Sequence, residues 1–144
     1  MLYLLDTDHI SLLQRQGART AAVRARMKRL PPDDFGVSIV TYEEQMKGRL
    51  RGTHDAKDIQ SQVAAYASLH QTLRYYLMTA VWDYTPRAAE IFAGLKTQKI
   101  NVGTQDLKIA AIALANEAIL LTCNAQHFSR VPLLQFEDWT VAYE

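Results

Sequence analysis

The chain opens with a short apolar run that ends at two acids, and this feature narrows its possible folds most. Residues 2–5 are Leu, Tyr, Leu and Leu, and Asp6 and Asp8 follow at once. A short apolar run that ends at polar residues is typical of a buried strand. In an open parallel sheet, ligands bind just outside the carboxyl ends of the strands, so Asp6 would lie where chemistry usually occurs. Carboxylates there can hold Mg²⁺ or Mn²⁺, or can attack a phosphate.

Apolar runs alternate with helical patterns along the rest of the chain, which favours a layered α/β domain. Further strands are expected at 35–40, 81–84, 118–121 and 133–136. Helices are expected at 9–16, 19–30, after residue 41 as far as an interruption at 52–54, then at 55–79, 86–97 and 105–116. We therefore expect a parallel sheet of four to five strands flanked by helices on both sides.

The longest expected helix, 55–79, carries an apolar stripe at three- and four-residue steps. Its members are Ile59, Val63, Tyr66, His70, Leu73 and Leu77. We expect this stripe to lie in the core or to face the preceding helix as one side of a helical hairpin.

The length and composition suit one globular domain, which we expect to span residues 1–144. No apolar run approaches the roughly 18 to 20 residues that a membrane span needs. A signal peptide is not expected, because acids follow the first strand at once and no basic segment precedes it. The single cysteine, Cys123, excludes an internal disulfide and fits a reducing cytoplasm, so we expect a cytoplasmic protein outside the membrane.

The net charge of +1 does not indicate a nucleic-acid-binding protein, but the basic residues are clustered. Six of them lie between residues 15 and 29 without an acid: Arg15, Arg19, Arg24, Arg26, Lys28 and Arg29. A second cluster comprises Lys47, Arg49 and Arg51. Basic groups near an acidic pocket suit a polyanion whose scissile phosphate meets a metal ion while its flanks meet Lys and Arg. A solvated helix face explains the first cluster equally well.

Acids lie just after expected strands or in the first turn of an expected helix, and an amide follows a further strand. They are Asp6, Asp8, Glu43, Glu44, Asp106 and Asn124. The carboxyl ends of parallel strands meet at one edge of a sheet, so these positions can converge. Two or three carboxylates there build an octahedral site with places open for water and a substrate phosphate. With Mg²⁺ or Mn²⁺ bound, such a site can generate hydroxide for in-line attack on a phosphodiester.

Each of these residues also has a purely structural explanation. Glu44, three residues after Thr41, could complete a capping box, and Asp106 could offset a helix dipole. Either acid of the first turn could be an N-cap, and Asn124 could be a turn residue. Caps need not all follow strands whose ends share an edge, so a common site explains the set better.

Four ordered segments carry a recognisable family pattern. They are residues 4–11 (LLDTDHIS), 38–44 (SIVTYEE), 100–114 (INVGTQDLKIAAIAL) and 120–124 (LLTCN). Together they resemble a PIN-domain nuclease, and more closely the VapC toxins of bacterial type II toxin–antitoxin modules. The likeness continues to residues 136–139 and so covers essentially the whole chain. It implies a three-layer PIN-like domain.

The resemblance implies an Mg²⁺-dependent endoribonuclease, with Mn²⁺ possible, that cuts RNA, pairs as a homodimer and is held inactive by a cognate VapB-type antitoxin. The catalytic positions of the family fall on Asp6, Glu44, Asp106 and Asn124. Of these, Asp6, Glu44 and Asp106 would hold the metal. Glu44 rather than Glu43 matches, because it lies three residues after Thr41. The family's bracing hydroxyls fall on Thr7, Ser11 and Thr122.

The last loop departs from the family pattern. Asn124 is neutral, so the site has three certain carboxylates, a second metal should bind more weakly, and action with one metal becomes more plausible. Where many relatives have an aspartate, this chain has His127 before Phe128. His127 could ligate Mn²⁺ better than Mg²⁺, or it could be a loop residue facing solvent or a phosphate.

Two other functions remain open from the sequence. A phosphatase of the haloacid dehalogenase type would use Asp6 as nucleophile and Asp8 as general acid, but it needs a late acidic pair after a strand. The late strand here ends in Thr122, Cys123 and Asn124. A degenerate PIN domain would bind RNA or its partner without cutting.

The cysteine and the histidines suggest no further chemistry. Cys123 is not expected to be a nucleophile, because no His–acid pair is visible near it and a small buried thiol is the commoner state. His9, His54 and His70 lack zinc-ligand spacing with one another or with Cys123.

Overall fold

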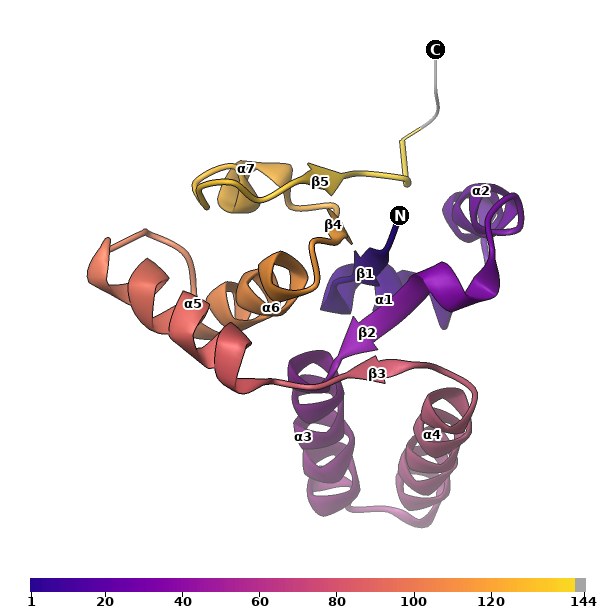
Figure 1. Cartoon of the computed structure of the whole chain (residues 1–144). Coiled ribbons are helices and arrows are strands. Elements are labelled where there is room, and N and C mark those ends of the chain that lie inside the picture. The colour runs from indigo at the N-terminus through magenta and orange to yellow at the C-terminus, as the bar shows by residue number, and fades with distance from the viewer. Residues whose placement is uncertain (142–144) are drawn as a thin grey trace.

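The computed structural model describes residues 1–141 as a five-stranded sheet with helices on both faces (Figure 1). The strands are β1 (Tyr3–Leu5), β2 (Phe35–Ser38), β3 (Val81–Trp82), β4 (Ile119–Leu121) and β5 (Phe136–Glu137). Their order is β3-β2-β1-β4-β5, and every neighbouring pair is parallel. The predicted three-layer α/β class is confirmed. The last three residues of the predicted domain, 142–144, lie outside the described part.

The helices alternate with the strands along the chain, as the sequence pattern predicts. They are α1 (Thr7–Leu13), α2 (Ala18–Met27), α3 (Ile39–Asp55), α4 (Ile59–Leu77), α5 (Pro86–Thr97), α6 (Thr104–Ala115) and α7 (Ala125–Phe128), with a 3₁₀ turn at η1 (Pro32–Asp34). Within residues 1–141, none of them is both long enough and apolar enough to cross a membrane.

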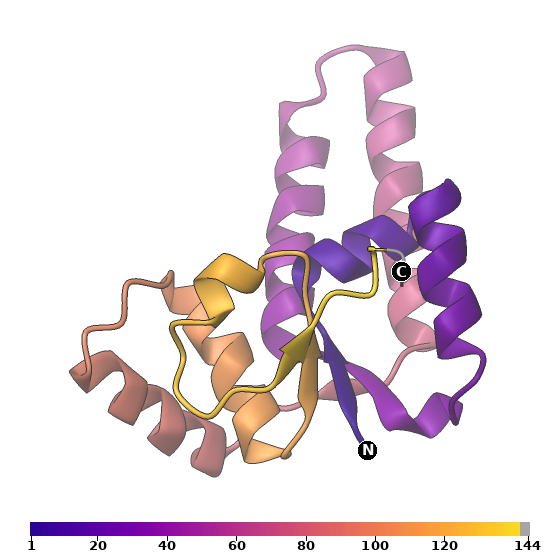
Figure 2. The ribbon, with the colours of Figure 1, turned by 90° about the horizontal axis from the view of Figure 1, so that it is seen from above.

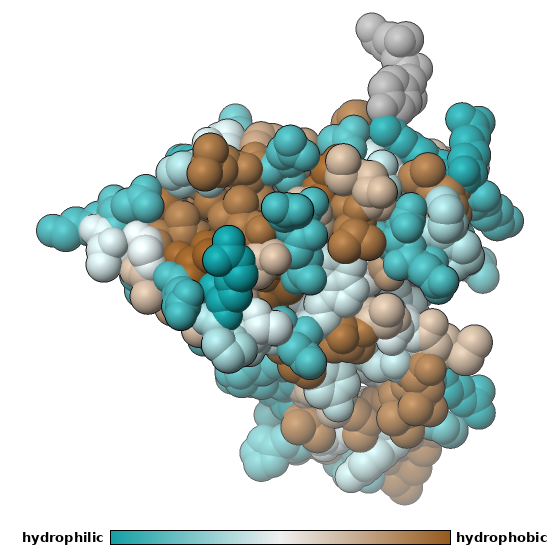
Figure 3. Space-filling model, in the orientation of Figure 1, coloured by the Kyte–Doolittle hydropathy of each residue, from teal (hydrophilic) through white to brown (hydrophobic). Residues whose placement is uncertain are grey.

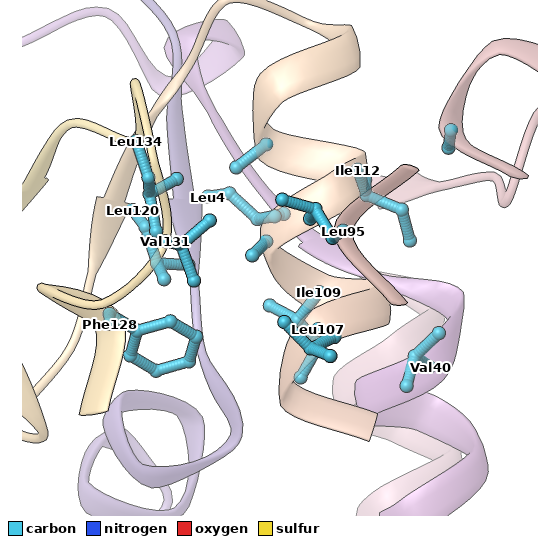
Figure 4. Close-up of a cluster of buried hydrophobic side chains, with 13 residues drawn as sticks. Leu4, Val40, Leu95, Leu107, Ile109, Ile112, Leu120, Phe128, Val131 and Leu134 are labelled. Carbon is cyan, nitrogen blue, oxygen red and sulfur yellow. The ribbon is translucent and has the colours of Figure 1, made fainter. Parts of the chain in front are cut away.

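Each face of the sheet has its own core, because successive side chains of a strand point to opposite sides. Leu4 and Leu120 lie in one cluster, which also contains side chains of α5 and α6 (Figure 4). Leu5 and Leu121 lie in the other, with side chains of α1 and α2. The parallel register pairs Leu4 with Leu120 and Leu5 with Leu121, so both strands divide between the faces in the same way.

Helix α6 lies inside the first cluster and is apolar on nearly all sides. Its fully buried residues are Ile109, Ala110, Ala111, Ile112 and Ala113. A helix that is apolar all round is stable only when it is covered all round, here by the sheet and by α5. This burial fixes the position of the first turn of α6, which carries Asp106.

Two helices begin earlier than the sequence analysis predicts, because polar side chains cap them. The Oδ1 of Asp6 accepts a hydrogen bond from the backbone N–H of His9 at 2.9 Å, so α1 begins at Thr7. The Oγ of Ser38 accepts from the backbone N–H of Thr41 at 3.0 Å, so α3 begins at Ile39 and β2 ends at residue 38. The capping box proposed for Glu44 does not exist, because Thr41 already lies inside the helix.

The interruption expected at 52–54 is wrong, since α3 continues through these residues to Asp55. The hydroxyl of Thr53 donates to the carbonyl of Leu50 at 2.8 Å and does not break the helix. The break falls at residues 56–58, where Asp58 caps α4 by accepting from the backbone N–H of Ser61 at 2.8 Å. A strong N-cap marks this boundary better than the glycine does.

The apolar stripe of α4 does not lie in the core, so that expectation is wrong. Ile59 and Val63 are 79% and 66% exposed. The expectation that the stripe faces the preceding helix is closer to the structure, because Tyr66 and His70 line a small cavity together with Tyr42 of α3. The α3–α4 hairpin extends away from the rest of the molecule (Figure 2). Periodicity identifies an apolar face of a helix but not what covers it.

The two edge strands are shorter than predicted. Strand β3 covers two residues instead of 81–84, and β5 overlaps the predicted strand 133–136 only at Phe136. Leu133 is exposed and has a left-handed φ of 66°, which interrupts an extended strand. Gly36 of β2 lies directly under the indole of Trp82, and a Cβ at this position would overlap that ring.

Candidate metal-binding site

Asp6 lies at the carboxyl end of the central strand β1 and is 4% exposed. Its backbone N–H donates to the carbonyl of Leu121 at 3.0 Å, which continues the pairing of β1 with β4. Its Oδ1 caps helix α1, so the second carboxylate oxygen remains for another ligand. The N-cap explanation is therefore correct, and it is compatible with metal binding.

Glu43 and Glu44 are neighbours in α3 with different surroundings. Glu44 is partly buried, and its Oε1 accepts a hydrogen bond from the hydroxyl of Thr7 at 3.0 Å. Glu43 is exposed and interacts with Gln105 at 2.8 Å and with Lys47 at 3.4 Å. These two partners lower the pKa of Glu43. Glu44 rather than Glu43 is thus hydrogen-bonded to α1, the helix that Asp6 caps.

A chain of hydrogen-bonded hydroxyl groups holds the carboxylate of Glu44 in position. The Oγ1 of Thr7 is 3.2 Å from the Oγ1 of Thr41, and the Oγ of Ser38 donates to the Oγ1 of Thr41 at 3.3 Å. This chain links the end of β2 to the start of α1. The family resemblance implies a role for the hydroxyl of Thr7 but none for that of Ser38. A Ser three residues before a Thr at a strand–helix junction is the sequence pattern that indicates an N-cap such as Ser38.

Asp106 lies in the first turn of α6 and is partly buried. Burial raises the pKa of Asp106, and the negative charges of Asp6 and Asp8 raise it further. Burial also raises the pKa of Glu44, to which the charge of Asp106 contributes, while the hydrogen bond from Thr7 opposes the shift. The carboxylates from β1, α3 and α6 therefore interact at one edge of the sheet.

Asp8 belongs to the same acidic edge but is exposed in the first turn of α1. Partial loss of hydration at its carboxylate raises its pKa, and the negative charge of Asp6 raises it further. Several carboxylates that raise one another's pKa form a site in which a cation would relieve the repulsion. Their oxygen donors fit a hard divalent ion such as Mg²⁺.

The side chains of Asp6, Glu44 and Asp106 lie too far apart for all three to be direct ligands of one ion. Among residues 1–141, three metal-ligating atoms lie within 4.8 Å of one another only at His9, Cys123 and Asp138. Oxygen ligands of Mg²⁺ lie about 2.0–2.1 Å from the ion. In this side-chain arrangement, Asp6, Glu44 and Asp106 could share an ion only if part of the coordination ran through water, which Mg²⁺ commonly retains.

Asn124 and His127 lie beside the acids. The backbone N–H of Asn124 donates to the hydroxyl of Thr122 at 2.9 Å, and its side-chain nitrogen is 2.9 Å from the Nδ1 of His127. A positive charge on His127 would oppose the rise in the pKa of Asp106. The structure thus brings all four predicted site residues to one edge, and His127 lies in the short helix α7 rather than in a loop.

A groove of about 650 Å³ adjoins Glu44 and is also lined by basic side chains. Thr7, Ser11 and Glu44 line it, as do Arg15, Arg24 and Arg49. Within residues 1–141 none of these arginines pairs with a carboxylate.

Two of these arginines are held in place by neutral groups. Arg24 donates to the carbonyl of Leu13 at 2.6 Å, and Arg49 donates to the hydroxyl of Thr72 at 2.9 Å. Neither guanidinium thus forms an ion pair with a carboxylate of residues 1–141. Part of the first basic cluster faces the groove, while Arg26 instead stacks on Trp139 and pairs with Glu137.

The fold and this edge of acids define the class of the protein. A model of the PIN domain matches residues 3–134, so the chain belongs to the PIN domain family. The protein named ribonuclease VapC1 from Haemophilus influenzae strain R2866 is 31% identical over 143 residues, which cover 97% of this chain and 99% of that protein. The chain thus groups with the VapC proteins of this family.

Solved structures agree with this grouping. VapBC-1 from nontypeable Haemophilus influenzae contains a chain with a TM-score of 0.78 and 28% identity, covering 98% of this chain and 100% of that one. A DNA-bound VapBC from Salmonella typhimurium gives a TM-score of 0.71 at 25% identity, covering 96% of this chain and 99% of that one. The phosphatase alternative is therefore excluded, and strand β4 is followed by Thr122, Cys123 and Asn124 rather than by acids.

Proposed function

We propose that this chain is a metal-dependent endoribonuclease that acts as the toxin of a type II toxin–antitoxin module. The observation that carries the proposal is the meeting of carboxylates that follow β1 or lie in α3 and α6, next to a groove lined by arginines that pair with no carboxylate among the described residues. Membership of the PIN domain family and the likeness to ribonuclease VapC1 support the same activity. A cytoplasmic location, where RNA and antitoxin are both present, is part of the proposal.

In this proposal Asp6, Glu44 and Asp106 hold the metal, Mg²⁺ or alternatively Mn²⁺, and Asn124 assists as a neutral catalytic residue. A bound divalent ion would supply hydroxide at neutral pH and would stabilise the leaving oxygen. The hydrogen bond from Thr7 keeps one oxygen of Glu44 fixed. The amide nitrogen of Asn124 lies 2.9 Å from the Nδ1 of His127, and this side chain would orient a phosphate oxygen.

The arginines of the groove would bind the RNA backbone on one side of the scissile bond. Arg15, Arg24 and Arg49 offer positive charge without paired acids, and a phosphodiester chain carries one negative charge per nucleotide. Contacts of this kind position the backbone and do not identify bases. The groove therefore accounts for binding of single-stranded RNA and predicts a strong dependence on salt.

The partner in this proposal is a VapB-type antitoxin that covers the α3–α4 hairpin, and the toxin forms a homodimer. Apolar residues gather over the lower part of the molecule in Figure 3, where Figure 1 places this hairpin. The related structures are VapBC assemblies. A helix or strand of the antitoxin beside the hairpin could push a basic side chain toward Glu44 and displace the metal.

The decisive experiment compares RNA cleavage by the wild-type chain and by Asp6→Asn. Asparagine is an equally good N-cap, so helix α1 should remain intact. We expect the cleavage rate with Mg²⁺ to fall at least about 100-fold, because several kcal/mol of stabilisation by the metal would be lost. Circular dichroism would confirm the fold of both proteins. Equal cleavage by the two proteins would remove Asp6 from the mechanism.

A further inference from the structure

Three side chains from distant parts of the chain form a second cluster, which lies next to Asp6 through His9. They are His9 in α1, Cys123 after β4 and Asp138 after β5. One ligand atom from each lies within 4.8 Å of the others. The Nδ1 of His9 is 3.7 Å from the Sγ of Cys123. The sequence analysis found no zinc-ligand spacing here, because pairing of β1 with β4 and of β4 with β5 creates the proximity.

The separation of sulfur and nitrogen suits a tetrahedral zinc site. Zinc binds Cys sulfur at about 2.3 Å and His nitrogen at about 2.0–2.1 Å, so a tetrahedral angle separates the two ligands by about 3.6 Å. The observed 3.7 Å matches this value without any movement of His9 or Cys123. A set of imidazole, thiolate and carboxylate selects a transition metal of the zinc type rather than Mg²⁺.

The imidazole of His9 makes no strong hydrogen bond within the described residues. Its side chain is fully buried, and its Nε2 has no hydrogen-bond partner among the described residues. Buried polar atoms are nearly always hydrogen-bonded, so an imidazole in this position is costly unless it has another role. With the proton on Nε2, the lone pair of Nδ1 is free to bind an ion next to Cys123, whose Sγ lies 3.7 Å away.

The carboxylate of Asp138 is held in place and remains accessible. Its Oδ1 accepts from the backbone N–H of Thr140 at 2.8 Å and from the hydroxyl of Thr140 at 2.5 Å, which leaves Oδ2 for a ligand. Cys123 and Asp138 are both partly exposed, so an ion can enter from solvent. Arg19 donates to the hydroxyl of Thr140 at 3.0 Å.

We propose that His9, Cys123 and Asp138 bind a single Zn²⁺ ion, with water as the fourth ligand. The Nδ1 of His9 is also 3.5 Å from the Oδ1 of Asp6. An ion bound at His9 would therefore attract the carboxylate of Asp6 and withdraw it from the acidic edge. Zn²⁺ would then slow RNA cleavage, a consequence that rests on the proposed function, whereas the binding site itself does not.

Binding is tested with Co²⁺ as a spectroscopic substitute for Zn²⁺, on the full chain. Because Cys123 is the only cysteine, a thiolate-to-cobalt charge-transfer band can arise only there. We expect the band in the wild type, its loss on addition of equimolar Zn²⁺, its absence in Cys123→Ser, and at least about tenfold weaker Co²⁺ binding in Asp138→Asn. Asp106→Asn is the matched control at the other acidic site and should retain the band. Absence of the band in the wild type, or its loss in Asp106→Asn alone, would overturn the proposal.

The link to Asp6 is tested by titrating Zn²⁺ into Mg²⁺-dependent cleavage. Wild-type cleavage should be inhibited at Zn²⁺ concentrations at least about tenfold lower than those that inhibit Cys123→Ser. Equal inhibition of the two proteins would contradict the link while leaving the binding result intact. A wild type that cuts no RNA with Mg²⁺ but gives the cobalt band would contradict the proposed function and not the zinc site.

Discussion

Neighbouring acids in this chain differ because of what each side chain contacts. Glu43 interacts with Gln105 and Lys47 on the surface, whereas Glu44 accepts from Thr7 and responds to the charge of Asp106. One helical residue is about 100° of rotation, which is enough to separate a solvated carboxylate from one at the sheet edge. The family pattern indicated Glu44 from its spacing to Thr41, and the geometry gives the physical reason for this spacing.

This difference predicts a large effect for one isosteric change and a small effect for the other. Glu44→Gln should raise the Mg²⁺ concentration for half-maximal RNA cleavage at least about tenfold, because a ligand charge is lost. Glu43→Gln should change that concentration less than about twofold, since it breaks only exposed contacts. Cleavage rates measured across a Mg²⁺ titration distinguish the two variants. Similar losses in both would show that Glu44 has no special role.

The raised pKa values of Glu44 and Asp106 predict how cleavage depends on pH. Metal binding needs both carboxylates ionised, so cleavage at a fixed Mg²⁺ concentration should decline at a higher pH than the ordinary pKa of an Asp or Glu, about 4. Saturating Mg²⁺ should shift the decline to lower pH, because the ion favours the ionised forms. A pH profile that is the same at low and saturating Mg²⁺ would contradict this expectation.

The same shifts predict that the metal-free protein is destabilised by its own acids. A carboxyl whose folded pKa is raised binds its proton more tightly when folded, so stability falls as the pH rises through that pKa. At neutral pH in chelator, Asp106→Asn should therefore raise Tm, by about 1–3 °C. Below the unfolded pKa the two proteins should melt alike at this site. A lower Tm for Asp106→Asn at neutral pH would contradict the repulsion.

Among the secondary-structure elements, the caps decided the boundaries that hydrophobic pattern alone left wrong. Ser38 ends β2 and begins α3, and Asp58 begins α4 after the short connection at 56–58. The glycine at 52 and the apolar run 35–40 predict both boundaries elsewhere, because neither feature takes side-chain capping into account. Helix α6 needed no such correction, since its apolar residues are continuous and its start was predicted within one residue.

Ser38 therefore has a testable role in both stability and function. Ser38→Ala should lower the free energy of unfolding by about 1 kcal/mol, because the cap to Thr41 is lost. Cleavage should also fall, since Thr41 contacts Thr7, which holds Glu44. Asp58→Ala is the matched control, as it removes a cap from the exposed end of α4 and should leave cleavage unchanged. Denaturant melts and cleavage rates of both variants test this, and equal effects on cleavage would contradict the hydroxyl chain.

At the scale of the whole molecule, the strand order brings the site together. β1 lies between β2 and β4, so the elements that follow these three strands meet at one edge. The helical hairpin, in contrast, has an apolar face that the described part of the chain leaves in solvent. The first arrangement completes a site within one chain, and the second leaves a surface for another chain.

A charge on the hairpin should therefore weaken antitoxin binding without unfolding the toxin. Val63→Asp changes a side chain that is 66% exposed, so Tm should change little. Affinity for the cognate antitoxin should fall at least about tenfold, because a charge would be buried in an apolar contact. Leu133→Asp, which lies at an exposed turn away from the hairpin, is the control. Calorimetry measures both affinities, and equal affinity of Val63→Asp and the wild type would exclude the hairpin.

The sequence by itself determined the alternation of strands and helices, the layered class and the acids that follow the strands, because short-range hydrophobic pattern and residue spacing carry this information. Only the tertiary structure decided which apolar face stays in solvent and which side chains become neighbours across strands. Those outcomes depend on sheet order and register. Together they bring residues 9, 123 and 138 close to one another, although residue 123 lies 114 positions after residue 9 and residue 138 lies 15 positions after residue 123. No local pattern records such contacts, since they exist only once β1, β4 and β5 have paired.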